Sequence, residues 1–339
     1  LNSFSPILRV IWKHQVQELV VQARIFNNYN ISELEAESVR KFLEHSPNLT
    51  ALTVIGNIDF YRPTYNFKLM TLICTDNEMT HSRPRNGYLN FKGFLLSQKD
   101  SLKELTLDFK GLIQKNFILN EMKLYKFHDL SYNLSLDYEE RIFPSTTIKD
   151  LKINGCEAVN SSVYFEMIVH NCPLAEKLDL LQFHGRCHET ILQLDELNHL
   201  KELKLRIPIL CQYEAISMDG FKHLQHLQVS IEIDLCRANS MDLLDALIDC
   251  CPSLKFLSIK HDMRFKNYYN EIPIDLKKLL TPLKMLEELH IDGFILGNYQ
   301  FIFETSLRKV KIFTKTFIVH AHLPEIFNST KVRLVLINV

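Results

Sequence analysis

The chain has few glycines and none of the common motifs of catalytic or nucleotide-binding sites. Nine glycines occur among its 339 residues, too few and too dispersed for the glycine-rich loops that cradle phosphate groups. The patterns G-x-G-x-x-G, G-x-x-x-x-G-K-[ST], G-x-S-x-G and H-E-x-x-H are all absent from the sequence. We therefore expect neither an enzyme nor a bound cofactor.

An excess of one charge and a long apolar run are also lacking. The 39 Lys and Arg residues are balanced by 40 Asp and Glu residues, unlike the basic composition of a nucleic-acid-binding protein. No apolar stretch approaches the roughly 18 residues that a membrane-spanning helix needs, and no secretory signal opens the chain. These features argue against nucleic-acid and membrane partners.

Clustered cysteines, which close the ends of many secreted repeat proteins with disulfides, are missing as well. Eight cysteines are spread through the chain, and this predicts reduced, buried thiols in a cytoplasmic or nuclear protein. The adjacent pair at 250 and 251 is expected at a helix end, with one thiol buried and one exposed. Five N-x-[ST] sequons favour a secreted or receptor ectodomain instead; they begin at Asn30, Asn48, Asn133, Asn160 and Asn328.

One group of histidines and cysteines has a spacing that could suit a metal ion. His184, Cys187 and His188 come one predicted helix after His170 and Cys172. They do not form the two C-x-x-C or H-x-x-x-H arms of a closed zinc site. We therefore predict no metal here.

The chain does contain a recurring triplet of apolar residues with the spacing L-x-x-L-x-L. It occurs thirteen times, with leading positions from 16 to 332, so the mean period is about 26 residues, inside the range of leucine-rich repeats. The leading residues are Val16, Leu49, Leu69, Leu102, Leu119, Ile148, Ala175, Leu200, Leu224, Leu254, Leu286, Leu307 and Val332, with the weakest copy at Leu119. Each triplet predicts one strand.

Residues 148–180 illustrate one complete repeat. After the strand triplet, apolar residues from Val163 recur at steps of three and four, the period of a helix, and Pro173 ends this helix before the next triplet. The alternation predicts an α/β leucine-rich-repeat solenoid, a horseshoe of about 13 repeats. Its parallel sheet would line the concave side, with helices and loops on the convex side.

Two regions are predicted along the chain. Residues 1–14 are expected to form an N-terminal capping segment that covers the open end of the first strand, and residues 15–339 a leucine-rich-repeat domain. Within that domain, a capped helix is predicted over 32–45, and further helices are predicted before Pro252 and Pro282.

Residues that flank the inner leucines of each strand alternate to the opposite, concave face of the sheet. They carry both signs of charge, which suits a folded protein or peptide that is recognised by local charge complementarity. The predicted partner-binding residues are Lys152, Asp179, Glu202, Lys204, Arg206, Gln228, Ser258, Glu288, His290, Asp292 and Lys311.

The repeat that contains Cys156 resembles the cysteine-containing leucine-rich repeats of F-box proteins. Its strand triplet is followed by cysteine three positions later, its helix ends in H-N-C-P-L, and similar turns, S-P-N-L and C-P-S-L, begin at Ser46 and Cys251. In two other repeats Phe183 and Phe294 take the place of this cysteine.

This resemblance implies the substrate-recognition part of an SCF-type E3 ubiquitin ligase. Such a protein would bind the Skp adaptor and the cullin through an F-box upstream of Leu1. The repeats would hold a protein target on the concave face and perform no bond chemistry. The alternative is a stand-alone intracellular leucine-rich-repeat scaffold, which would use the same face without ubiquitin machinery.

Overall fold

The computed structural model describes the strands of the chain and several of the helices between them. The described residues are 16–22, 33–55, 65–75, 91, 93–108, 122–129, 147–153, 168–170, 172–181, 194, 196–207, 221–231, 239–261, 272–297, 306–314 and 332–338. The chain divides into two compact units. Unit 1 comprises Leu1–Cys156 with His170–Cys172, and unit 2 comprises Glu157–Val169 with Pro173–Val339. The predicted capping segment 1–14 lies outside the described residues.

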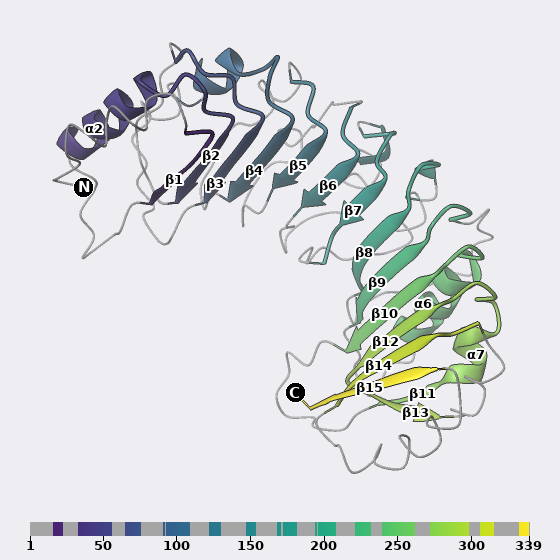
Figure 1. Ribbon diagram of the computed structural model, residues 1–339. Coiled ribbons are helices and arrows are strands. Elements are labelled where there is room, and N and C mark those ends of the chain that lie inside the picture. The colour runs from purple at the N-terminus through teal and green to yellow at the C-terminus, as the bar shows by residue number, and fades with distance from the viewer. Residues whose placement is uncertain are drawn as a thin grey trace. The chain divides into compact units, whose positions relative to one another are not determined.

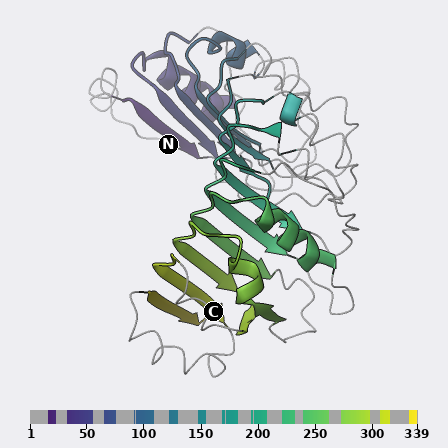
Figure 2. The same cartoon turned by 90° about the vertical axis from the view of Figure 1, so that its right-hand side faces the viewer.

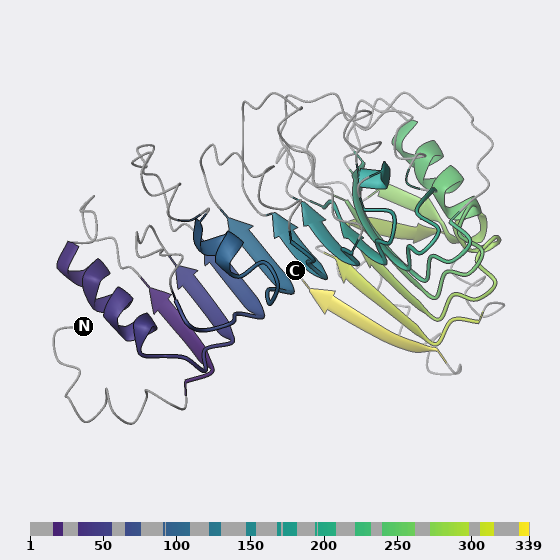
Figure 3. The ribbon, with the colours of Figure 1, turned by 90° about the horizontal axis from the view of Figure 1, so that it is seen from above.

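Unit 1 contains parallel strands that follow one another in chain order (Figure 1). They are β1 (Glu18–Gln22), β2 (Ala51–Ile55), β3 (Thr71–Thr75), β4 (Glu104–Asp108), β5 (Lys126–Asp129) and β6 (Asp150–Ile153). The helix α2 (Glu33–Glu44) lies between β1 and β2 in the chain and beside them in space (Figure 3). It confirms the helix predicted over 32–45.

Unit 2 contains a second set of parallel strands in chain order. They are β7 (Lys177–Asp179), β8 (Glu202–Ile207), β9 (His226–Ile231), β10 (Phe256–His261), β12 (Glu288–Asp292), β14 (Lys309–Thr314) and β15 (Arg333–Asn338). The helices α6 (Asn239–Asp249) and α7 (Leu276–Leu280) confirm those predicted before Pro252 and Pro282. Both lie on one side of this sheet (Figures 1 and 2), and their buried leucines include Leu244, Leu247 and Leu279.

The strands pair so that equivalent positions of successive repeats are opposite one another. In unit 2, Leu203 is in register with Leu178 and Leu227, and in unit 1, Leu52 is in register with Leu72. The exposed fractions of Leu52, Leu72, Leu203 and Leu227 are all 0%. The triplet leucines therefore form the continuous core of each unit, which makes each one a leucine-rich-repeat solenoid.

A regular hydrogen-bond pattern marks the start of the strands in both units. Before most strands, one carbonyl accepts hydrogen bonds from two consecutive N–H groups of the next repeat. In unit 1, Met70 O accepts from Lys103 N at 2.9 Å and from Glu104 N at 3.0 Å. In unit 2, Lys201 O accepts from Gln225 N and His226 N, both at 2.9 Å. Since the pattern recurs from repeat to repeat, it fixes the same register throughout each sheet.

The predicted triplets at Leu119 and Val332 are in the wrong register. Leu105 pairs with Phe127 and Val310 pairs with Leu334, so the inner residues of these two repeats include Phe127 and Leu334. Phe127 is fully buried. The L-x-x-L-x-L pattern missed Phe127 because a phenylalanine followed by a polar residue does not match it. In the last strand, apolar residues occupy both the inward and the outward positions, so the pattern fits either register.

Unit 2 also contains a two-stranded parallel sheet that the sequence analysis did not predict. The strands β11 (Ile272–Asp275) and β13 (Phe294–Gly297) pair in register from Ile272 with Phe294 onward. Gly293 has φ 81°, a conformation that glycine adopts without steric cost, and it lets the chain pass from β12 into β13. Phe294 is fully buried there.

An aromatic cluster and one buried amide fill the core of unit 1 beside β3. The ring centroids of Tyr65 and Phe67 lie 5.1 Å apart, and Phe94 meets both rings edge-on. The side-chain oxygen of Gln98, which is 2% exposed, accepts a hydrogen bond of 2.9 Å from the backbone N–H of Leu69. The buried polar group is thus satisfied.

Candidate functional site

The predicted contact residues lie on the face of each sheet that is opposite to the buried triplets. We call this the exposed face of the unit. Lys152 on β6 belongs to unit 1, and the other residues belong to unit 2. Partly exposed side chains are those of Lys152, Asp179, Glu202, Lys204, Gln228, Ser258, Glu288, His290, Asp292 and Lys311.

Arg206 departs from the expectation of an exposed contact residue. Its exposed fraction is only 3%, and that of Ser230, its register partner on β9, is 8%. The alternation of a strand fixes the direction of a side chain but not what covers it. We therefore correct the expectation for Arg206, which is buried at the carboxyl end of β8.

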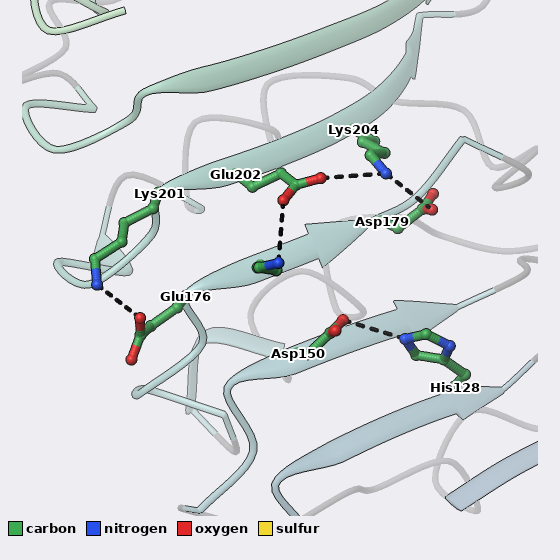
Figure 4. A network of polar contacts seen from close by, with 8 residues as sticks. His128, Asp150, Glu176, Asp179, Lys201, Glu202 and Lys204 are labelled. Atoms are coloured by element: carbon green, nitrogen blue, oxygen red, sulfur yellow. Dashed lines mark hydrogen bonds and ion pairs between the residues drawn. The ribbon is translucent and has the colours of Figure 1, made fainter. Parts of the chain in front are cut away.

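Most charged residues on the exposed face of unit 1 lie on its last three strands. His128 Nε2 lies 3.1 Å from Asp150 Oδ1 (Figure 4), and Lys126 Nζ lies 3.8 Å from Glu104 Oε2. The equivalent positions of β2 and β3 are uncharged, with Thr53 and Ile73 in register. Apart from Glu18 on β1, which is in register with Ala51, the charged residues of this face therefore lie on β4, β5 and β6.

The first strands of unit 2 carry a network of ion pairs (Figure 4). Lys204 Nζ lies 3.2 Å from Glu202 Oε1 and 4.0 Å from Asp179 Oδ2, and Lys177 Nζ lies 3.6 Å from Glu202 Oε2. At the start of the same strands, Lys201 Nζ lies 2.7 Å from Glu176 Oε2. Each cation has a carboxylate neighbour, so this part of the face is close to neutral overall.

A second charged cluster lies on β12 and β14. Glu288 Oε1 is 2.5 Å from His290 Nε2, 2.6 Å from Lys309 Nζ and 3.7 Å from Lys311 Nζ. The carboxylate of Glu288 is thus the ion-pair partner of two ammonium groups. The side chains of Lys309 and Lys311 are 31% and 27% exposed. This cluster carries an excess of positive charge.

Burial and these contacts shift both titrating groups of the cluster. Burial works to raise the pKa of Glu288, but hydrogen bonds from Lys309 and His290, together with their charges, outweigh it and lower the pKa. For His290, burial lowers the pKa, and the hydrogen bond to Glu288 opposes that shift without cancelling it. Hence Glu288 is ionised and His290 is neutral near pH 7.

Aromatic rings from four neighbouring strands meet on the exposed face of unit 2. His226 on β9 stacks on Phe256 of β10, with ring centroids 5.6 Å apart. His290 of β12 meets Phe256 edge-on at 4.8 Å and Phe313 of β14 at 6.3 Å. We call these four residues the aromatic row. The alternation of each strand places all four on the exposed face, but only His290 was among the predicted contact residues, because the strand register is needed to show that the rings meet.

The four cysteines among the described residues form no disulfide, and three of them, Cys74, Cys172 and Cys251, are buried. Cys251 is fully buried and its Sγ donates a hydrogen bond of 3.0 Å to Leu247 O, whereas Cys250 is partly exposed. This confirms a helix end with one thiol in and one out. Burial raises the pKa of the Cys172 thiol to about 12, so this thiol is not a reactive thiolate.

Neither a metal cluster nor a membrane span is found among the described residues. No group of three or more His, Cys, Asp or Glu side chains is placed to hold a metal ion there. The described helices also include none that is long and apolar enough to cross a membrane. The predicted group at His184, Cys187 and His188 lies outside the described residues, so the metal prediction stays a prediction.

Comparisons with known proteins give only distant structural similarities. No protein-family model and no curated protein matches the chain. The leucine-rich-repeat-containing protein LegL7 of Legionella pneumophila is similar over 74% of this chain and 84% of its own, with 14% identity and a TM-score of 0.39.

Two further solved structures match over most of this chain. The TLR13–ssRNA13 complex covers 94% of this chain and 61% of its own, with 12% identity and a TM-score of 0.38. The mouse RP105/MD-1 complex covers 88% and 61%, with 14% identity and a TM-score of 0.33. The leucine-rich-repeat assignment rests on the register and burial described above, and these similarities add no argument about function.

Proposed function

We propose that this chain recognises a protein target and is the substrate-recognition part of an SCF-type E3 ubiquitin ligase. The observation that carries protein recognition is the exposed face of unit 2. There, partly exposed lysines and carboxylates alternate across neighbouring strands and stand beside an aromatic row. Mixed charge with aromatic anchors is the chemistry of a protein-binding surface, whereas a polyanion would be repelled by Asp179, Glu202 and Asp292.

The ligase role is supported by the resemblance of the repeats to those of F-box proteins. In such a protein, an F-box upstream of Leu1 would bind the Skp adaptor and the cullin. The repeats would hold the target near a ubiquitin-conjugating enzyme on the same assembly. Their contribution would be effective concentration, without bond chemistry.

Affinity purification of the full-length natural protein from its own cells tests this role. We expect the Skp adaptor and the cullin to be recovered, and to be lost when the segment upstream of Leu1 is deleted. Recovery of target proteins without either of these subunits would contradict the ligase role and favour a stand-alone binding scaffold.

A further inference from the structure

The aromatic row crosses the exposed face of unit 2 obliquely. His226 and Phe256 are register partners, but His290 is in register with Ser258 and Phe313 with Asp292. The row therefore shifts along the strands by two residues at each of its last two steps. Its ring centroids follow one another at 5.6, 4.8 and 6.3 Å, so the row is at most about 17 Å long, which about five residues of an extended peptide would cover.

Positive charge lies on the β14 side of the row. Lys309 and Lys311 share the single carboxylate of Glu288, and Lys309 is in register with the exposed Arg333 of β15. Lys260 and Asp292 form a pair of 3.4 Å that adds no net charge. With His290 neutral, this side of the row has more cations than anions.

Apolar side chains continue beyond the last ring. Val335 is in register with Lys311, and Ile337 with Phe313, so both lie on the exposed face rather than in the core, and both are partly exposed. A ligand that follows the row thus meets rings, ammonium groups and aliphatic side chains together.

We propose that the aromatic row binds an extended peptide segment of the target in which an acidic residue stands next to an aromatic or apolar one. This rests on the proposed function, because it names the chemistry of the segment that the same face would recognise. The ammonium groups of Lys309 and Lys311 would attract the acidic residue, and Phe256 and Phe313 would contact its apolar neighbour.

A peptide selection tests the proposal without knowledge of the natural target. The probe is a library of random peptides of about 12 residues, displayed on phage and selected on the full chain. The enriched peptides are then synthesised, and their affinities are measured by fluorescence anisotropy. We expect enriched sequences in which Asp or Glu stands beside Phe, Tyr, Trp, Leu or Ile.

Matched variants locate the bound peptide. Lys311→Glu and Phe313→Ala should each weaken binding by about tenfold or more. Lys311→Arg, which keeps the charge, should stay close to the wild-type affinity, as should Lys284→Glu, which reverses an exposed charge between α7 and β12. Thermal melting of each variant shows whether it folds, and if Phe313→Ala does not fold, Lys311→Glu decides alone.

Several outcomes would overturn the assignment. These are a failure to enrich any peptide, enriched peptides without acidic residues, or binding that survives both Lys311→Glu and Phe313→Ala. Competition by poly-uridine RNA that depends on the same two residues would assign the row to nucleic acid instead. If Lys204→Glu is the only variant that loses peptide binding, the row is not the binding site, but the exposed face still recognises protein.

Discussion

Leu203 and Lys204 are neighbours in β8 with opposite environments. Leu203 is fully buried between Leu178 and Leu227 of the adjoining strands, and Lys204 lies on the exposed face with 31% of its side chain exposed. Leu203→Ala should lower the free energy of unfolding by about 2–5 kcal/mol, because it removes buried methyl groups and leaves a cavity. Lys204→Ala should lower it by less than about 1 kcal/mol.

Chemical denaturation of the two variants checks this difference. Leu205→Ala is a second core variant and should behave like Leu203→Ala, because Leu205 is 1% exposed. Equal damage from Leu203→Ala and Lys204→Ala would show that the assigned register of β8 is wrong.

His290 predicts a pH dependence of stability. Its pKa in the folded chain is below its ordinary value of about 6.5, so the unfolded chain binds the proton more readily and stability falls as the pH drops below about 6.5. The groups that face the imidazole are Glu288 on its own strand, Lys309, Lys311 and the Phe313 ring on β14, and the Phe256 ring on β10.

Thermal melting between about pH 7.5 and pH 5.5 measures this effect. His290→Gln should lose less melting temperature over this interval than the wild type, since the substitution removes the titrating group. The pKa of Glu288 is lowered, so its own protonation destabilises the fold only below about pH 4.3, its ordinary value, outside the interval. Identical slopes for the two proteins would contradict the assignment of a neutral, half-buried His290.

For the strand β15, the structure and the sequence pattern give two different registers, and each register buries different residues. Leu334 is in register with the buried Val310, and Val335 with the exposed-face Lys311. Leu334→Ser should therefore lower the free energy of unfolding by roughly 1–3 kcal/mol, and Val335→Ser should have little effect. Urea denaturation of both variants distinguishes them, and the reverse order of damage would restore the register predicted from the sequence.

The sequence predicts most strands because an apolar residue, most often leucine or isoleucine, occurs at each of their inner positions, with mostly polar residues between. In β15 the sequence pattern does not give the register, because Leu334 and Val335 both suit a buried position. Only the pairing with β14 shows which of the two is the inner residue. The pattern also misses Phe127 of β5, which stands where the template expects leucine. The strand pair of Ile272 with Phe294 depends on residues far apart in the sequence, so local periodicity could not reveal it.

The same limit applies to the candidate site: the alternation within one strand predicts which residues face outward, but not how they contact the neighbouring strands. The alternation of β12 sufficed to select Glu288 and His290 for the exposed face. It could not show that Arg206 is buried, or that Phe256 and Phe313 flank His290, because these facts depend on neighbouring strands.

For the whole molecule, each repeat is stabilised mainly by its neighbours within a unit. Leu105→Ala in β4 of unit 1 should therefore speed amide hydrogen exchange in β3, β4 and β5, while β12 of unit 2 keeps its protection. Hydrogen exchange followed by mass spectrometry checks this expectation. Uniform loss of protection along all described strands would instead indicate one cooperative folding unit.

The central claim is that the exposed face of unit 2 binds the protein target. The most direct test compares affinity purifications of the full-length natural protein with those of two folded variants. One variant reverses the exposed-face charges of Glu202, Lys204 and Lys311, and the control reverses those of Asp249, Lys277 and Lys284 on and beside α6 and α7. We predict that only the first variant loses the targets recovered by the wild type, while the Skp adaptor and the cullin stay with both. Recovery of the same targets by the first variant would contradict the account.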